Sequence, residues 1–95
     1  MIAAVFGGFN RARIPAPMTG YVAMGSNLGN RAAHLRAGLD GLVDEGVRLV
    51  EVSSVWETEP VGMPGAPPFW NMVVEIETER TARELLDLLL SIEKT

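Results

Sequence analysis

The 95-residue chain is predicted to be a small α+β domain in which helices cover one face of an antiparallel sheet. Two segments carry apolar residues at helical spacing, and three others have the composition and alternation of strands. Their order along the chain is strand, helix, strand, strand, helix. This order is typical of a ferredoxin-like βαββαβ sandwich that lacks its last strand.

Composition restricts the class of protein further. An apolar content of 47% is ordinary for a globular chain. The net charge is -4 and the basic residues form no run, so nucleic acid is not an expected partner. No apolar run is long enough to span a bilayer, so no membrane partner is expected. There is no cysteine, which is compatible with the cytoplasm, the expected location.

Residues 1–20 are expected to form an N-terminal extension outside the fold, either disordered or non-native. They show no sustained periodicity and contain two prolines. Because no positively charged segment precedes the apolar stretch at 2–9, a signal peptide is disfavoured. An upstream start codon, with Met18 as the natural start, is the other explanation. Residues 21–95 are expected to form the domain.

The first strand and helix are predicted over residues 21–26 and 31–44. The strand is a short apolar run of the kind found in buried strands. Asn30 is a candidate N-cap of the helix, and Gly46 is placed to end it in a left-handed conformation. The apolar stripe of the helix consists of Ala32, Leu35, Leu39 and Leu42.

The remaining elements follow from local signals. Residues 47–58 are rich in valine and predict a strand, whereas the glycines and prolines of 61–68 require a loop. Residues 69–78 alternate and predict the clearest strand. A Thr81–Glu84 capping box begins a second helix over 82–94. The residues expected to pack together are Trp70, Met72, Val74 and Ile76 of the strand with Leu85, Leu88, Leu89 and Ile92 of the helix.

In the complete ferredoxin-like topology the last strand would pair with the first. Residues 21–26 are therefore expected to present an exposed apolar edge. Such an edge invites pairing with another chain, so self-association through it is a possible interaction of this protein.

The strand at 21–26 runs into the turn Gly25–Gly29, whose sequence is Gly-Ser-Asn-Leu-Gly. The turn is not a P-loop, because it lacks the Gly-Lys-Ser/Thr ending. Taken alone it is more typical of a simple strand-to-helix turn than of a phosphate cradle, since glycine and asparagine tolerate positive φ. His34, the only histidine, is expected to lie at the surface.

Phe69 and Asn71 lie two residues apart on a strand, so both side chains point to the same face. An aromatic face beside a carboxamide suits a planar heterocycle, because the ring can stack while the amide donates and accepts at its edge. Spacing alone favours the simpler interpretation of a partly buried phenylalanine and a strand-start asparagine.

Two motif blocks together resemble the hydroxymethyl-dihydropterin pyrophosphokinase family of folate biosynthesis. They are the Gly25–Gly29 turn and the segment that runs from Thr58-Glu59-Pro60-Val61-Gly62 to Phe69-Trp70-Asn71. The resemblance covers residues 21–93. It implies a diphosphokinase that transfers pyrophosphate from ATP to the hydroxymethyl group of 6-hydroxymethyl-7,8-dihydropterin. Dihydropterin and ATP would be its small-molecule partners, with Mg²⁺ as cofactor.

The resemblance also implies site residues. Thr58 and Val61 would offer backbone contacts to the pterin, Phe69 would stack on it, and Asn71 would hydrogen-bond its edge. The loop at 62–68 would cover the substrates. Two positions on the second helix, Leu86 and Glu93, would approach the nucleotide, although their spacing alone indicates a core leucine and a solvated carboxylate at the helix end. No catalytic residue is assigned.

In the family, two aspartates of a Trp-Gly-Pro-Arg-Thr-x-Asp-Leu-Asp segment hold the magnesium ions, and this segment would follow Glu93. The chain does not contain it, so the metal ligands are expected to be absent and the 95 residues to show little or no turnover. The alternative hypothesis is a non-catalytic ferredoxin-like binding or assembly module that pairs through its exposed strand edge.

Overall fold

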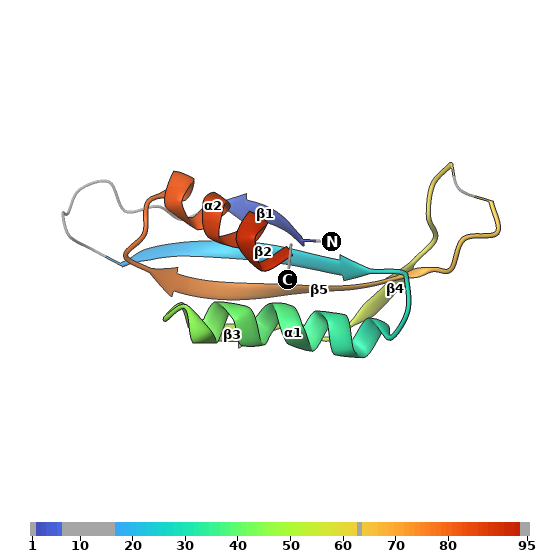
Figure 1. The fold of residues 1–95 in the computed structure, drawn as a ribbon, viewed down its shortest axis with the longest axis horizontal. Coiled ribbons are helices and arrows are strands. Elements are labelled where there is room, and N and C mark those ends of the chain that lie inside the picture. The colour runs from blue at the N-terminus through green and yellow to red at the C-terminus, as the bar shows by residue number, and fades with distance from the viewer. Residues whose placement is uncertain (1, 7–16, 63, 94–95) are drawn as a thin grey trace.

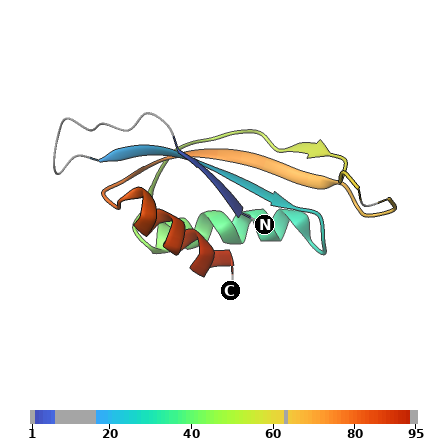
Figure 2. The same cartoon turned by 90° about the horizontal axis from the view of Figure 1, so that it is seen from above.

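The computed structural model describes residues 2–6, 17–62 and 64–93. Five antiparallel strands form one sheet in the order β1-β2-β5-β3, and β4 also pairs with β5. Both helices cover the same face of this sheet, which confirms the predicted α+β class (Figures 1 and 2). The elements are β1 (Ile2–Phe6), β2 (Met18–Ser26), α1 (Arg31–Asp44), β3 (Arg48–Val52), β4 (Trp56–Thr58), β5 (Phe69–Thr78) and α2 (Ala82–Glu93).

The core lies between the two long central strands and the helices. In the antiparallel register Val22 of β2 stands opposite Val74 of β5, and both are fully buried. Because side chains alternate along a strand, every second residue of β5 points to the helices and the others point to the open face. The buried apolar residues are Val22, Met24, Leu35, Leu42, Val47, Met72, Val74, Ile76, Leu85 and Leu89.

Helix α1 has the predicted bounds, and local hydrogen bonds explain both ends. The Asn30 side chain accepts a bond from the Ala33 amide at 3.1 Å, as an N-cap does. The buried stripe of α1 differs from the predicted one at two positions, because Ala32 is exposed and Gly38 is buried. A glycine on the buried face has no side chain, so the helix can lie close to the sheet.

The C-terminal end of α1 is a Schellman motif. Gly46 has φ +80°, and its amide donates to Val43 O at 3.0 Å. The Val47 amide donates to Leu42 O, also at 3.0 Å, and both of these side chains are buried. The predicted left-handed glycine is thus confirmed, because it satisfies two carbonyls that the helix leaves unpaired.

The single strand predicted over 47–58 is wrong, because the structure has two strands, β3 and β4. A register shift between Leu49 and Glu51 bends the chain. Ser53 then pairs with Val73 through its amide, at 2.9 Å, and through its hydroxyl, which accepts from the Val73 amide at 2.8 Å. The chain rejoins β5 at Trp56, and this re-entry supplies one wall of the site described below.

The first-strand edge that was expected to be exposed is paired within the chain. Strand β1 runs antiparallel to β2, from Ile2 opposite Met24 to Phe6 opposite Gly20. An edge strand leaves a row of amides and carbonyls without partners, and β1 supplies those partners. Residues 2–6 and 18–20 of the expected extension therefore belong to the sheet, whereas 7–16 lie outside the described residues.

Helix α2 begins with the predicted capping box. The Glu84 amide donates to Thr81 Oγ1 at 3.1 Å, and the Thr81 amide donates to Glu84 Oε1 at 3.0 Å. The hydrogen bond from the Thr81 backbone, then that from its hydroxyl, and the charge of Arg80 hold the pKa of Glu84 below its ordinary value.

This shift predicts a pH-dependent contribution of Glu84 to folding. A carboxylate whose pKa is depressed on folding stabilises the fold above its unfolded-state pKa, and the stabilisation is lost as pH falls through the folded-state value. We expect the urea midpoint of wild type to exceed that of Glu84→Gln at pH 7, and the gap to shrink as pH falls below about 4.5. Glu79→Gln, an exposed carboxylate outside the box, is the control. A gap that stays constant with pH would contradict the prediction.

Candidate functional site

A pocket of about 260 Å³ opens on the face of the sheet that the helices leave uncovered. It lies where β2, β4 and β5 meet, because the register places Trp56 opposite Asn71 and Thr58 opposite Phe69. Same-face alternation then directs these four side chains to one side of the sheet. The lining residues are Ala23, Met24, Gly25, Trp56, Thr58, Phe69, Asn71 and Met72.

The carboxamide of Asn71 is held in one orientation. Its Nδ2 donates to Thr58 Oγ1 at 2.9 Å and to Trp56 O at 3.4 Å, both on the neighbouring strand. A Cβ atom on Gly25 would lie only 3.1 Å from Asn71 Oδ1, so the glycine makes room for this amide. The pocket therefore presents a preoriented amide oxygen that can accept a hydrogen bond from a ligand.

Two aromatic side chains form the apolar walls. Phe69 is half-buried, and Trp56 is 45% exposed. Aromatic faces favour flat, offset-stacked partners. A pocket smaller than the roughly 300–1,000 Å³ of drug-sized ligand sites suits a compact ring system rather than a whole nucleotide. The combination can therefore recognise a planar heterocycle by its face and by its polar edge.

A second cavity, of about 360 Å³, adjoins the first, since Phe69 lines both. The Gly25–Gly29 turn forms one wall and carries its positive φ at Gly29, +63°. Ser26 Oγ lies 3.0 Å from His34 Nδ1, which ties the turn to the first turns of α1. The residues lining this cavity are Ser26, Asn27, Leu28, His34, Phe69 and Glu93.

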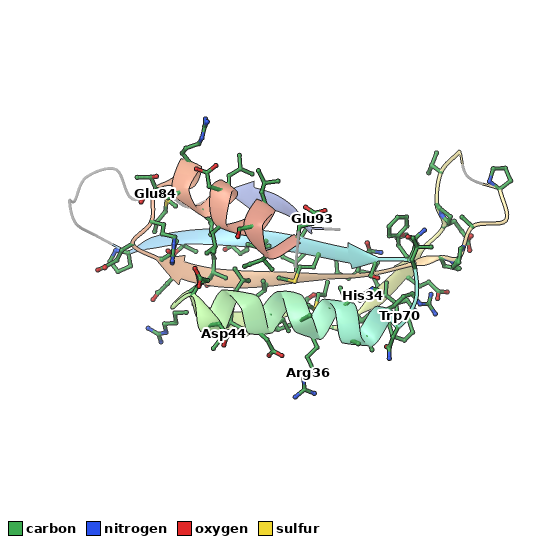
Figure 3. The ribbon with its side chains drawn as sticks, viewed as in Figure 1. His34, Arg36, Asp44, Trp70, Glu84 and Glu93 are labelled. Carbon is green, nitrogen blue, oxygen red and sulfur yellow. The ribbon has the colours of Figure 1, made fainter. Side chains whose placement is uncertain are left out.

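Four of the six expected site residues line one of these two cavities, and the other two line neither. Three of them, Thr58, Phe69 and Asn71, share the smaller pocket, although a loop separates the first from the other two in the chain. Glu93, the last residue of α2, is labelled in Figure 3, and it lines the larger cavity. Val61 is 96% exposed in the loop and Leu86 is 40% exposed on α2, and neither lines these two cavities.

Trp56 and Gly25 are among the pocket residues that sequence reasoning missed. Trp56 lies two positions before Thr58, so the same-face spacing that joined Phe69 with Asn71 could have identified it. Gly25 was noticed only as part of a turn. Its closeness to Asn71 depends on the pairing of β2 with β5 and has no signal in the sequence.

Within 2–6, 17–62 and 64–93, no group of three or more His, Asp or Glu side chains could hold an ion. Of the helices in these ranges, neither has the length and apolar character needed to cross a bilayer.

The chain is similar in sequence to proteins of one known family. Residues 21–95 match the model of the family described as 7,8-dihydro-6-hydroxymethylpterin-pyrophosphokinase. The chain is 43% identical over 74 residues to the 2-amino-4-hydroxy-6-hydroxymethyldihydropteridine pyrophosphokinase of Bacillus subtilis, covering 77% of this chain and 44% of that protein. It is 38% identical over 77 residues to the Haemophilus influenzae protein of the same name, covering 80% and 48%.

A plant protein shows the same similarity within a longer chain. The "Folate synthesis bifunctional protein" of Arabidopsis thaliana is 37% identical over 73 residues, which is 77% of this chain and 15% of the plant protein. The chain thus spans about half the length of the bacterial relatives that it matches and a small part of the plant one.

Proposed function

This chain belongs to the 7,8-dihydro-6-hydroxymethylpterin-pyrophosphokinase family, and on that premise we propose that its smaller pocket binds the pterin of an ATP-dependent pyrophosphoryl transfer in folate biosynthesis. One observation carries the proposal. A single cavity is lined by three residues that match the family's pterin-binding motif. They are Thr58 on β4 and Phe69 and Asn71 on β5. A cytoplasmic location, compatible with the lack of cysteine, is part of the proposal.

Each wall of the pocket has a role in this proposal. The pterin ring stacks on Phe69, with Trp56 as a second aromatic surface. The oriented amide of Asn71 pairs with the polar edge of the ring, and Thr58 keeps that amide in place at 2.9 Å. Val61 remains a candidate for a backbone contact from the loop.

The larger cavity is the proposed nucleotide side. Because Phe69 lines both cavities, a ring in the smaller one would point its substituent towards the larger one. Glu93, which lines that cavity, and Leu86 on the same helix are the proposed nucleotide contacts. ATP is the proposed co-substrate and Mg²⁺ the proposed cofactor. No ligand for the ion is proposed among the described residues.

The proposed reaction moves the β- and γ-phosphates of ATP together onto the hydroxymethyl group of the dihydropterin. The hydroxymethyl oxygen of the dihydropterin forms a bond to the β-phosphorus of ATP, and the bond from that phosphorus to the α–β bridging oxygen breaks. AMP leaves with that oxygen, and the hydroxyl proton is released. Such transfers depend mainly on positioning and on neutralising charge. In this proposal the described residues contribute the positioning of the ring.

The alternative of an assembly module that pairs through an exposed β2 edge has lost its supporting observation. Within the described residues that edge is hydrogen-bonded to β1. We therefore favour the pterin site.

Ring binding can be tested directly on this chain. We expect 6-hydroxymethylpterin to bind saturably and to quench Trp56 fluorescence, because Trp56 lines the pocket. Phe69→Ala should weaken the affinity roughly tenfold or more, as loss of one aromatic stacking partner does. Tyr21→Ala is the matched control, since Tyr21 is an exposed aromatic of the same sheet face outside the pocket. Absence of saturable binding to a folded wild-type chain would overturn the proposal.

A further inference from the structure

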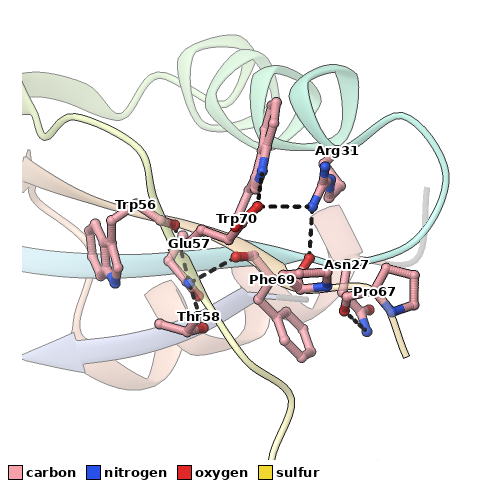
Figure 4. Close-up of polar contacts among 10 residues, drawn as sticks. Asn27, Arg31, Trp56, Glu57, Thr58, Pro67, Phe69 and Trp70 are labelled. Atoms are coloured by element: carbon pink, nitrogen blue, oxygen red, sulfur yellow. Dashed lines mark hydrogen bonds and ion pairs between the residues drawn. The ribbon is translucent and has the colours of Figure 1, made fainter. Parts of the chain in front are cut away.

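Three side chains from separate elements meet beside the start of β5 and form what we term the Arg31 cluster: Arg31 at the start of α1, Glu57 of β4 and Trp70 of β5 (Figure 4). Trp70 Nε1 donates to Glu57 Oε1 at 3.2 Å. The Arg31 guanidinium carbon lies 4.4 Å from the centre of the Trp70 ring, within the range of a cation–π contact.

Arg31 also holds the end of the loop that precedes β5. Its Nη1 donates to Pro68 O at 2.9 Å and lies 3.6 Å from Glu57 Oε1. The Glu57 side chain is 57% exposed, so solvent weakens that ion pair. The Arg31 side chain is only 26% exposed, and its bond to the Pro68 carbonyl and its stacking on Trp70 are the stronger contacts.

The Arg31 cluster and the pocket lie on opposite faces of β5, because successive side chains of a strand point to opposite faces of the sheet. Trp70 points to the helix face, whereas Phe69 points to the open face (Figure 4). Asn71 lies on the same face as Phe69 by the alternation of the strand, and both line the pocket. Fixing the Trp70 ring and the Pro68 carbonyl restricts rotation of the backbone on both sides of Phe69. Glu57 likewise adjoins Thr58, which holds the Asn71 amide.

We propose that Arg31, Glu57 and Trp70 are positioning residues for the pterin that act from the opposite face of the sheet. Arg31 and Trp70 hold Phe69 in its binding orientation, and Glu57 acts through Thr58 on the Asn71 amide. None of the three lines the pocket, so they act through the residues that do. This inference rests on the proposed function, because it concerns the geometry of that same pocket.

Arg31→Lys is the most informative variant. Lysine keeps the positive charge but lacks the planar guanidinium that stacks on Trp70 while donating to Pro68 O. We expect calorimetry to give about tenfold weaker binding of 6-hydroxymethylpterin, the loss of about one charge-assisted hydrogen bond. The Phe69 and Asn71 amides should exchange faster with solvent deuterium, with the urea midpoint nearly unchanged.

Two comparisons separate positioning from a merely structural role. Arg36→Lys is the matched control, because Arg36 lies on the same helix and points away from the sheet (Figure 3). In a Phe69→Ala background the effect of Arg31→Lys should shrink to about twofold or less, since the side chain that it positions is gone.

The outcomes distinguish this inference from the proposed function. If wild type binds no pterin, the proposed function fails and the inference falls with it. If wild type binds but Arg31→Lys behaves like Arg36→Lys, the inference alone is overturned. An equal loss with and without Phe69 would also overturn it, because it would show that Arg31 acts on the fold as a whole and not through that residue.

Discussion

Replacing Asn71 with leucine is expected to abolish most pterin binding while leaving the chain folded. Leucine has a similar shape, but it lacks the amide oxygen that accepts a hydrogen bond at the ring edge, so one polar group of the ligand loses its partner. We expect a cost of about 1–3 kcal/mol of binding free energy, or roughly 5- to 150-fold in Kd. Calorimetric titration of wild type and variant measures it.

Two further variants sharpen this prediction. Glu75→Leu makes the same polar-to-apolar change on the same strand face, outside the pocket, and should leave Kd within about twofold of wild type. Gly25→Ala adds a methyl group 3.1 Å from Asn71 Oδ1 and should weaken binding by displacing the same amide. If Asn71→Leu binds like wild type while Phe69→Ala does not, edge recognition is refuted and stacking alone accounts for affinity.

Leu42→Ala is expected to have the largest effect on stability. Leu42 is fully buried between α1 and the sheet, and its carbonyl accepts the Val47 amide at the end of the helix. Removing its side chain leaves a cavity at the centre of the core, which costs about 2–5 kcal/mol. Natural domains have only about 5–15 kcal/mol of total stability, so the variant should be marginally folded.

Urea denaturation monitored by far-UV circular dichroism tests this prediction. The midpoint should fall sharply with little change in the slope of the transition. Val43→Ala is the control, because Val43 is the next residue of the same helix and is 54% exposed, so its truncation should change stability by about 0.5 kcal/mol or less. Equal losses in the two variants would contradict the assigned core.

Much of the fold could be predicted from the sequence because its signals are local. The bounds of α1 follow from Asn30 and Gly46, which satisfy the ends of the helix within a few residues. The alternation of β5 and the Thr81–Glu84 box are likewise complete within short segments. The pairing of Phe69 with Asn71 on one face needed only the two-residue period of a strand.

The features that sequence reasoning missed or misplaced depend on segments that are distant in the chain. The pairing of β1 with β2, the break between β3 and β4, and the approach of Gly25 to Asn71 are each decided by which strands become neighbours. No local propensity encodes such contacts, because the same residues would satisfy a strand with other partners.

The same distinction between local signals and distant contacts applies to the candidate site. The sequence by itself determined the chemistry of the pocket, an aromatic face and an amide two residues apart, together with the family to which the chain belongs. Only the tertiary structure decided that Gly25 approaches Asn71 and that Arg31, Glu57 and Trp70 meet behind Phe69. The reason is physical: a side chain's type sets what it can bind, whereas the pairing of distant strands sets what it meets.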